Sequence, residues 1–85
     1  MNIRRDLEHF LVNELAPDRR AKTIAPDEDL ITQGNIDSVG LMQLVSFIEN
    51  EFGITITDDD LVIDNFRTLR SIEDFILRKR EMIAR

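Results

Sequence analysis

The sequence has no cysteine, no tryptophan and no tyrosine, and His9 is its only histidine. Without cysteine the chain can form no disulfide, no zinc-cysteinate site and no thiol nucleophile of its own. No apolar run approaches the roughly 18 residues of a membrane span, and no signal peptide opens the chain. We therefore expect a soluble, cytoplasmic protein.

Basic residues are also scarce, with 11 Lys and Arg against 17 Asp and Glu and a formal net charge of −6. Nucleic acids and anionic membranes bind to basic surfaces, so we expect neither of them as a partner. The chain of 85 residues is 42% hydrophobic, which is too apolar for disorder. Because so short a chain cannot build two cores, we expect one domain over residues 1–85, present as a monomer.

Apolar residues at helical spacing predict three longer helices. The first covers residues 2–15, and the last begins at a cap formed by Thr68 or Ser71. A short helix is expected over residues 58–65. Together these elements predict an all-α fold, a small four-helix bundle of three longer helices and one short helix.

The second helix has the clearest limits. It begins at Asp37 or Ser38, either of which is a good N-cap, and it ends near Phe52, where Gly53 permits a left-handed stop. At about 100° per residue, five apolar side chains fall on one arc and predict its buried face. They are Leu41, Leu44, Val45, Ile48 and Phe52.

A long loop of about twenty residues, 16–36, connects the first two helices, and loops of this length are uncommon unless they carry function or local structure. Residues 26–31 can form one helical turn, and Gly34 with Asn35 suits a sharp turn. Three apolar residues should anchor the loop to the core: Leu30, Ile31 and Ile36.

Val39 points almost directly away from the buried arc of the second helix, within one turn of Ser38. Its outward neighbours are Gln43, Ser46 and Asn50, with Met42 and Phe47 at the edges and Glu49 and Glu51 as a rim. Single exposed apolar residues are normal on any surface, and helical geometry alone favours that interpretation. The alternative is an apolar docking strip around Ser38.

The sequence gives little support for a catalytic site or a metal site. A serine nucleophile at Ser38 needs a base, and the periodicity places His9 on the outer face of the first helix. Residues 27–29 and 58–60 are acidic but lack the alternating acids, glycine and distal glutamate of a calcium loop. They are better interpreted as acidic first turns of short helices. We expect no catalytic residue and no metal site.

The segment "IDSVGLMQLVSFIENEFGITI", residues 36–56, resembles the phosphopantetheine-attachment segment of acyl and peptidyl carrier proteins. Members of that family carry an Asp-Ser-Leu-like motif at a helix start, here Asp37-Ser38-Val39, then a leucine-rich face, then Glu-x-x-Phe-Gly-Ile, here residues 49–54. Residues 56–76 resemble the third and fourth helices of the family. The resemblance covers nearly the whole chain.

By this resemblance Ser38 is the residue to which a phosphopantetheinyl transferase attaches 4′-phosphopantetheine from coenzyme A. Asp37 would position the helix start and meet the transferase. The arm would carry acyl or aminoacyl groups as thioesters, so the resemblance implies a carrier and not an enzyme. The implied docking surface on the second helix comprises Val39, Met42, Gln43, Ser46 and Phe47.

The resemblance also bears on the cargo. Two residues, Asn35 and Ile36, separate Gly34 from Asp37, as in freestanding carriers of aminoacyl or polyketide pathways, whereas many fatty-acid carriers have one. In addition, Gly40 and Gln43 stand at outward positions that are often acidic in fatty-acid carriers. The implied role lies in polyketide, nonribosomal peptide or related specialised biosynthesis.

The implied partners are a phosphopantetheinyl transferase, an acyl- or aminoacyl-activating ligase or an acyltransferase, and downstream synthase or tailoring enzymes. Two alternatives stay open. One is a carrier for fatty-acid synthesis, and the other is a small helical interaction domain without a prosthetic group.

Overall fold

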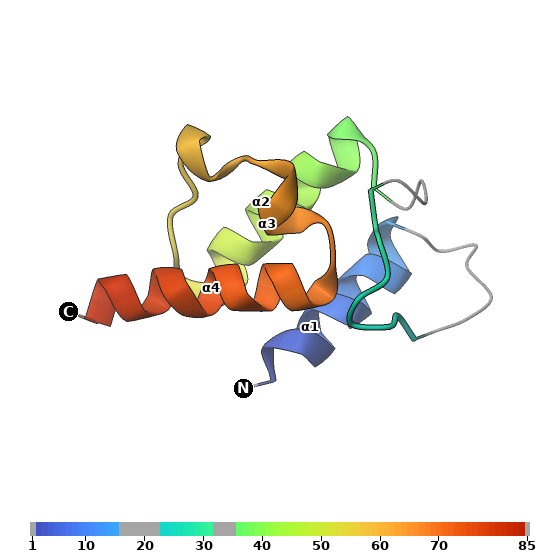
Figure 1. Cartoon of the computed structure of the whole chain (residues 1–85), viewed down its shortest axis with the longest axis horizontal. Helices are drawn as coiled ribbons and strands as arrows, with labels where there is room; N and C mark the ends of the chain where they lie inside the picture. The colour runs from blue at the N-terminus through green and yellow to red at the C-terminus, as the bar shows by residue number, and fades with distance from the viewer. Residues whose placement is uncertain (1, 16–22, 32–35, 85) are drawn as a thin grey trace.

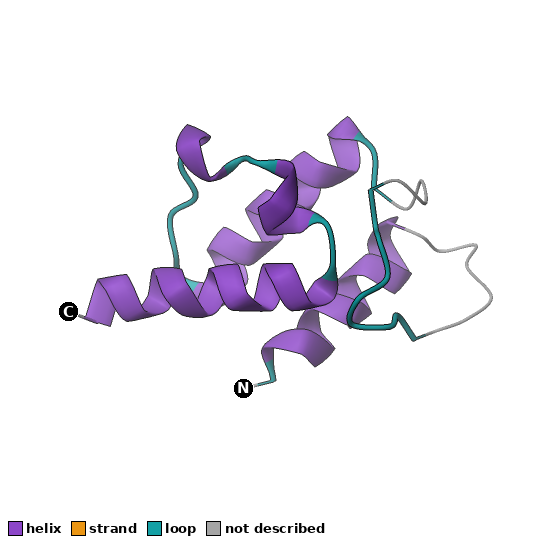
Figure 2. Ribbon diagram, in the orientation of Figure 1, coloured by secondary structure: helices purple, strands orange, loops and turns teal. Residues whose placement is uncertain are grey.

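The computed structural model describes residues 2–15, 23–31 and 36–84. In chain order its elements are α1 (Ile3–Phe10), a π-helical turn η1 (Leu11–Leu15), α2 (Ser38–Phe52), a 3₁₀ turn η2 (Asp58–Asp60), α3 (Ile63–Phe66) and α4 (Leu69–Ala84) (Figure 1). Loops join them, and none of the described residues lies in a strand (Figure 2). The predicted all-α bundle of three longer helices and a short one is confirmed.

The first helix is α1 continued by η1. Asn2 caps it, because its side-chain oxygen accepts a hydrogen bond from the N–H of Arg5 at 2.9 Å. At the junction with the π turn, the N–H of Leu11 bonds to two carbonyls, those of Leu7 and Glu8. The chain is therefore helical as far as Leu15, as the apolar spacing predicts.

The core contains residues from every helix and from the loops. Seventeen apolar side chains of the described residues are buried, and they include Ile3, Leu7, Leu11 and Val12 from the first helix and Leu69, Ile72, Phe75 and Ile76 from α4. Four of the five residues predicted for the inner face of α2 are buried, and the fifth, Leu41, is partly buried against them. The predicted facing of α2 is thus confirmed.

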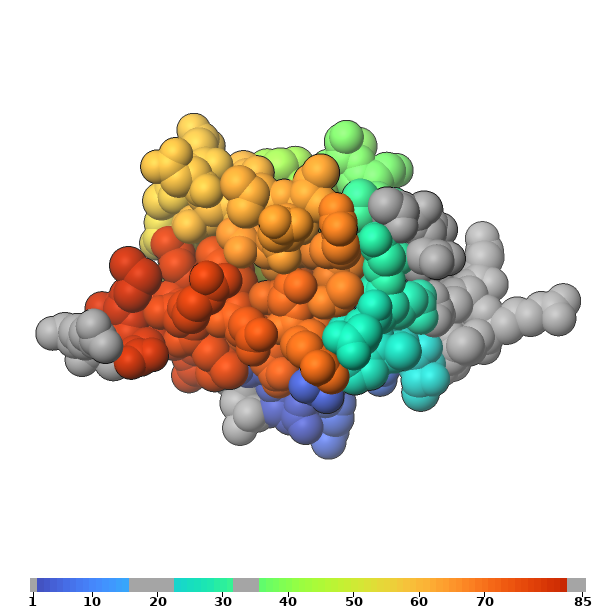
Figure 3. Space-filling model, viewed as in Figure 1, coloured from blue at the N-terminus to red at the C-terminus, as the bar shows by residue number. Residues whose placement is uncertain are grey.

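The helical turn expected over residues 26–31 is absent, and this expectation is wrong: the described segment 23–31 is not helical. It forms a hydrogen-bonded turn, from the N–H of Glu28 to the carbonyl of Ala25 at 3.0 Å, and then extends along the start of α4 (Figure 3). The N–H of Leu30 donates to the carbonyl of Arg67 at 2.7 Å, and the carbonyl of Pro26 accepts from Arg70 at 3.1 Å. These bonds between segments replace those of a helix.

Two of the three anchors predicted in this connection, Leu30 and Ile36, are buried, and Ile31 is partly buried against the core. The sharp turn predicted at Gly34 and Asn35 lies outside the described residues. The anchors fix the chain just before α2, since the N–H of Ile36 also bonds to the carbonyl of Leu30 at 3.1 Å.

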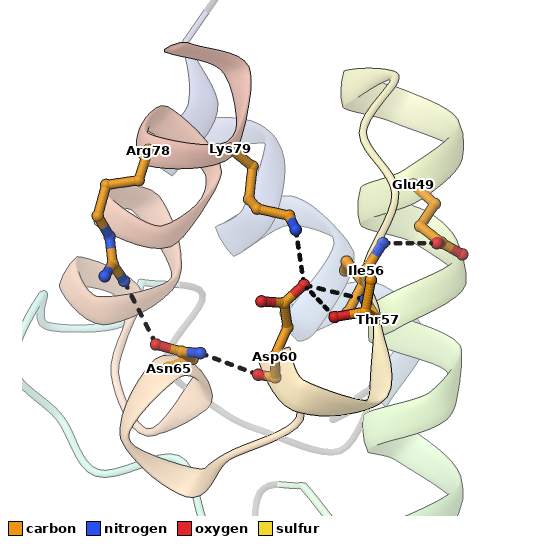
Figure 4. Close-up of polar contacts among 7 residues, drawn as sticks. All are labelled: Glu49, Ile56, Thr57, Asp60, Asn65, Arg78 and Lys79. Carbon is orange, nitrogen blue, oxygen red and sulfur yellow. Dashed lines mark hydrogen bonds and ion pairs between the residues drawn. The ribbon is translucent and has the colours of Figure 1, made fainter. Parts of the chain in front are cut away.

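The short helix predicted over residues 58–65 is divided into η2 and α3. The division falls at Val62, whose backbone is extended (φ −113°, ψ 146°) and cannot continue a helix. The side chain of Asn65 compensates by donating to the carbonyl of Asp60 at 2.9 Å (Figure 4). Burial of Phe66, which packs 5.5 Å from Phe75 between ring centroids, holds α3 on α4.

The remaining helix ends follow local rules. Gly53 ends α2 with a left-handed backbone (φ 68°), as predicted. Of the two caps considered for α4, Thr68 is the one used, because its hydroxyl accepts the N–H of Ser71 at 3.0 Å. Among the described helices none is both long and apolar enough to cross a membrane.

Candidate functional site

At the start of α2, different residues provide the helix cap and the exposed hydroxyl. The sequence alone allowed either Asp37 or Ser38 to be the cap. Asp37 is the N-cap: its backbone is extended and its carboxylate accepts the N–H of Gly40 at 2.6 Å. Its carbonyl accepts the N–H of Leu41 at 2.8 Å. Ser38 is therefore the first residue within the helix and is not needed as its cap.

The hydroxyl of Ser38 is consequently available. The residue is exposed, and its side chain makes no hydrogen bond to any residue that the structure describes. Because its neighbour Asp37 caps the helix, chemical modification of this oxygen would cost the helix no capping bond. An exposed hydroxyl at a helix N-terminus also lies in the positive field of the helix dipole, which favours a negatively charged group there.

Gly40 does not stand at an outward position, and that expectation is corrected. It is buried, and a Cβ added to it would lie 3.1 Å from the Asp37 carboxylate and 3.8 Å from side-chain atoms of Ile36 and Leu15. Glycine at this position allows the cap, the loop before α2 and the end of η1 to approach closely. Gly40 therefore gives no indication of the cargo, whereas Gln43 is exposed as expected.

A groove of about 880 Å³ lies along the outer side of α2, and its surface is mainly apolar. Ser38 lines it together with all five residues of the predicted docking surface, Val39, Met42, Gln43, Ser46 and Phe47. Val39 and Met42 are 67% and 54% exposed, which confirms that they face outward. The structure thus brings Ser38 and the predicted surface together in one concave feature.

The first helix supplies the other wall of this groove. Phe10 stacks on Phe47 with ring centroids 4.3 Å apart and an interplanar angle of 9°, and Phe47 contacts Phe52 edge-on at 6.1 Å. Glu14 also lines the groove. The sequence analysis did not predict a role for Phe10 or Glu14. Phe10 lies in the predicted first helix, but no spacing rule pairs it with Phe47.

Of the two glutamates predicted to form an acidic rim, Glu49 and Glu51, only one lines the groove. Glu51 lines the groove beside Asn50. Glu49 lies elsewhere, because its carboxylate accepts the backbone N–H of Ile56 at 2.9 Å and ties the segment after α2 back to the helix (Figure 4).

The other residues that suggested chemistry lie away from Ser38. His9 is exposed and does not line the groove. Asp60 closes a capping box with Thr57 and pairs with Lys79 at 2.7 Å (Figure 4). The hydrogen bond from Lys79, and then the N–H of Thr57, lower the pKa of Asp60. Within the described residues no group of His, Cys, Asp and Glu side chains is arranged to bind a metal ion.

Matches to known proteins include a family model and a solved structure. The family model described as "Phosphopantetheine attachment site" matches residues 12–76, which is more than half of the chain. A solved structure, "Structure of KstB-PCP(apo)", is similar with a TM-score of 0.71 and 34% sequence identity. That match covers 86% of this chain and 80% of the other.

Proposed function

The chain belongs to the family of phosphopantetheine-binding carrier proteins, which are not enzymes, and from that premise we propose that Ser38 is its attachment residue. The observation that supports this proposal most directly is that the cap of α2 and the exposed hydroxyl come from two different residues. Asp37 caps the helix through Gly40, and the neighbouring Ser38 presents an exposed hydroxyl that bonds to none of the described residues.

The residues around Ser38 fit a phosphopantetheine group. The first turn of α2 favours the phosphate through the helix dipole, and the groove that begins at Ser38 can accept an uncharged arm. When bound, the group supplies the thiol that the cysteine-free chain lacks, and acyl groups are held on it as thioesters. The transferase has to activate the hydroxyl, because Asp37 is committed to Gly40 and His9 lies outside the groove.

We assign the partner surface to Val39, Met42, Gln43, Ser46 and Phe47, which share the groove with Ser38. Apolar side chains exposed beside an attachment point give partner enzymes a patch to bury. Asp37 would contact the transferase through the part of its carboxylate that the Gly40 N–H leaves accessible. Carriers of this family interact with phosphopantetheinyl transferases and with loading and synthase enzymes, which are partners that need this access.

For the pathway we propose a peptidyl or aminoacyl carrier of specialised biosynthesis, of the nonribosomal peptide or polyketide type. The solved relative is named as a PCP, and 34% identity over 86% of this chain supports the same class. The cargo would be selected by a ligase or acyltransferase, because the carrier contributes only an attachment point and a docking surface.

Intact-mass measurement tests the attachment. After incubation with coenzyme A and a promiscuous phosphopantetheinyl transferase, the protein is expected to gain one phosphopantetheine group. Ser38→Ala should gain nothing, because the accepting oxygen is removed. The matched control is Thr55→Ala, which removes an exposed hydroxyl outside the groove and should be modified fully. Modification of Ser38→Ala, or no modification of the wild type, would refute the assignment.

A further inference from the structure

We infer that the groove between the first helix and α2 holds the protein's own phosphopantetheine arm, extended from Ser38 towards Glu51, when no partner enzyme is bound. This inference rests on the proposed attachment at Ser38 and adds a resting position for the arm. The groove is the evidence: Ser38 lines one end of it, and Asn50 and Glu51 line the other.

The length of the groove matches the length of the arm. Residues 38 and 50 are separated by about 18 Å along the axis of α2, at 1.5 Å per residue. About fourteen bonds join the serine oxygen to the terminal sulfur of the arm, which reaches about 17 Å at the spacing of an extended chain. An arm lying in the groove would therefore place its thiol beside Asn50.

The lining also matches the chemistry of the arm, which consists of a dimethyl-substituted carbon, a hydroxyl, two amides and a thiol between short methylene segments. Val39, Met42 and the stacked rings of Phe10 and Phe47 offer apolar contacts to the methyl and methylene groups. Three uncharged polar side chains, Gln43, Ser46 and Asn50, offer hydrogen bonds to the amides and the hydroxyl.

These polar residues follow one line of the helix. Positions 43, 46 and 50 are three and four residues apart, so their side chains lie one above another on the same face. Of the two carboxylates in the lining, Glu51 lies near the thiol end, about 18 Å or more along α2 from the phosphate. Glu14 lies on the opposite wall, between Phe10, which stacks on Phe47, and Leu15, which packs near Gly40. The arm would therefore keep its one charged group away from Glu51.

The inner side of α2 offers no equivalent path. Leu44 and Ile48 have no exposed surface and pack into the core, whereas the groove is open to solvent along its length. An arm in an open groove can leave without unfolding any helix. Because the groove contains all five proposed docking residues, partner binding and arm storage would exclude each other, and docking would release the arm.

The absence of cysteine allows a specific test. In the holo protein the arm would carry the only thiol, so a maleimide nitroxide would label the arm alone. In ¹⁵N-labelled protein, the backbone amides of Ser46 and Phe10 and the side-chain amides of Gln43 and Asn50 should lose most of their peak intensity. Reduction of the nitroxide should restore it. Peaks of exposed residues of α4, such as Leu77 and Arg80, should keep theirs.

A variant pair separates storage in the groove from tumbling of a free arm. Ser46→Trp fills the groove at an exposed position and should restore the Asn50 peak. Because Ser46 belongs to the proposed docking surface, this substitution is expected to slow the transferase, so the variant is incubated until its mass gain is complete before the spectra are recorded. Arg80→Trp adds the same ring to an exposed position of α4 and should leave the broadening of Asn50 unchanged.

The outcomes distinguish the inference from the proposed function. No mass gain on the wild type would refute the attachment at Ser38 and with it this inference. A full mass gain with broadening confined to residues 36–42 would leave the attachment intact and refute storage in the groove. Broadening of the Asn50 peak that persists in Ser46→Trp would also refute storage in the groove, provided that circular dichroism shows the variant to be folded. The wild-type measurement decides the matter if the variant does not fold.

Discussion

Asp37 and Ser38 are adjacent, both are polar and both are exposed, yet the structure gives them different tasks. The carboxylate of Asp37 is bonded to the N–H of Gly40, and the hydroxyl of Ser38 has no partner among the described residues. A helix start that is capped by one residue leaves the next free for chemistry. Stability measurements of variants can show whether Asp37 or Ser38 supports the helix start.

Asp37→Ala should lower the free energy of unfolding by about 1 kcal/mol, because it removes the side chain that caps α2. Asp37→Asn should recover most of that loss, since asparagine is an equally good N-cap. Urea denaturation monitored by circular dichroism measures both. Ser38→Ala is the matched control and should change stability by less than about 0.5 kcal/mol. An equal loss in Ser38→Ala would mean that the serine, too, supports the helix start.

At the scale of elements, the loop between α2 and α4 depends on one small polar cluster. Asp60 pairs with Lys79 of α4 at 2.7 Å and accepts hydrogen bonds from the N–H and the hydroxyl of Thr57, at 2.9 and 3.1 Å (Figure 4). Both members of the ion pair are about four-fifths shielded from solvent, with 18% and 21% of their side chains exposed. The cluster therefore anchors η2 to the middle of α4.

The Asp60 cluster predicts a specific acid sensitivity. The hydrogen bonds from Lys79 and Thr57 hold the pKa of Asp60 below its ordinary value of 3.8. The folded state therefore gains stability from the charged carboxylate above about pH 3.8, and this gain is lost as the pH falls through the lower folded pKa. Asp60→Asn should cost roughly 1 kcal/mol at pH 7 and flatten the decline of stability below pH 4.

Urea denaturation between pH 2.5 and pH 7 measures this effect. Asp59→Asn is the matched control, because Asp59 is exposed and makes no hydrogen bond to the described residues. It should leave both the stability at pH 7 and the acid decline close to those of the wild type. The same flattening in both variants would contradict the role given to the Asp60 cluster.

Elements defined by local rules were predictable from the sequence, and those defined by contacts between segments were not. Both ends of α2 were predicted within a residue because an aspartate cap and a left-handed glycine act over only a few residues. The non-helical course of residues 23–31 depends on bonds to another segment, at Arg67 and Arg70, and the division at Val62 is accompanied by the bond from the Asn65 side chain to the Asp60 carbonyl. No periodicity in the sequence encodes those bonds.

The candidate site follows the same division. The outward facing of Val39 and Met42 follows from helical geometry and was correct. The burial of Gly40 and the wall formed by Phe10 follow from how the first helix packs on α2, through Leu15 and Phe47. A helical projection of α2 alone cannot contain those contacts, so the sequence indicated only an apolar strip on α2, and the second wall that makes it a groove was not predicted.

At the scale of the whole molecule, the bundle turns one side of α2 inward and leaves the side with Ser38 exposed. A carrier with a net charge of −6 and exposed apolar residues beside the proposed attachment residue can offer partners both long-range attraction and a patch to bury. Val39 is the most exposed large apolar residue of the groove, at 67%. It is the position where docking can be disturbed with least effect on the fold.

Val39→Asp should leave the helical circular dichroism unchanged and alter the free energy of unfolding by no more than about 0.5 kcal/mol, because the side chain is exposed in the first turn of α2, where a carboxylate suits the dipole. Loading of the arm by the transferase and the cognate ligase should slow, since a charge now lies where a partner must bury apolar surface. Initial rates of mass gain measure this. Val62→Asp makes the same change at a valine that is 49% exposed and does not line the groove. Equal slowing in both variants would show that the added charge, and not the groove, governs partner access, whereas slowing in Val39→Asp alone places docking on the outer face of α2.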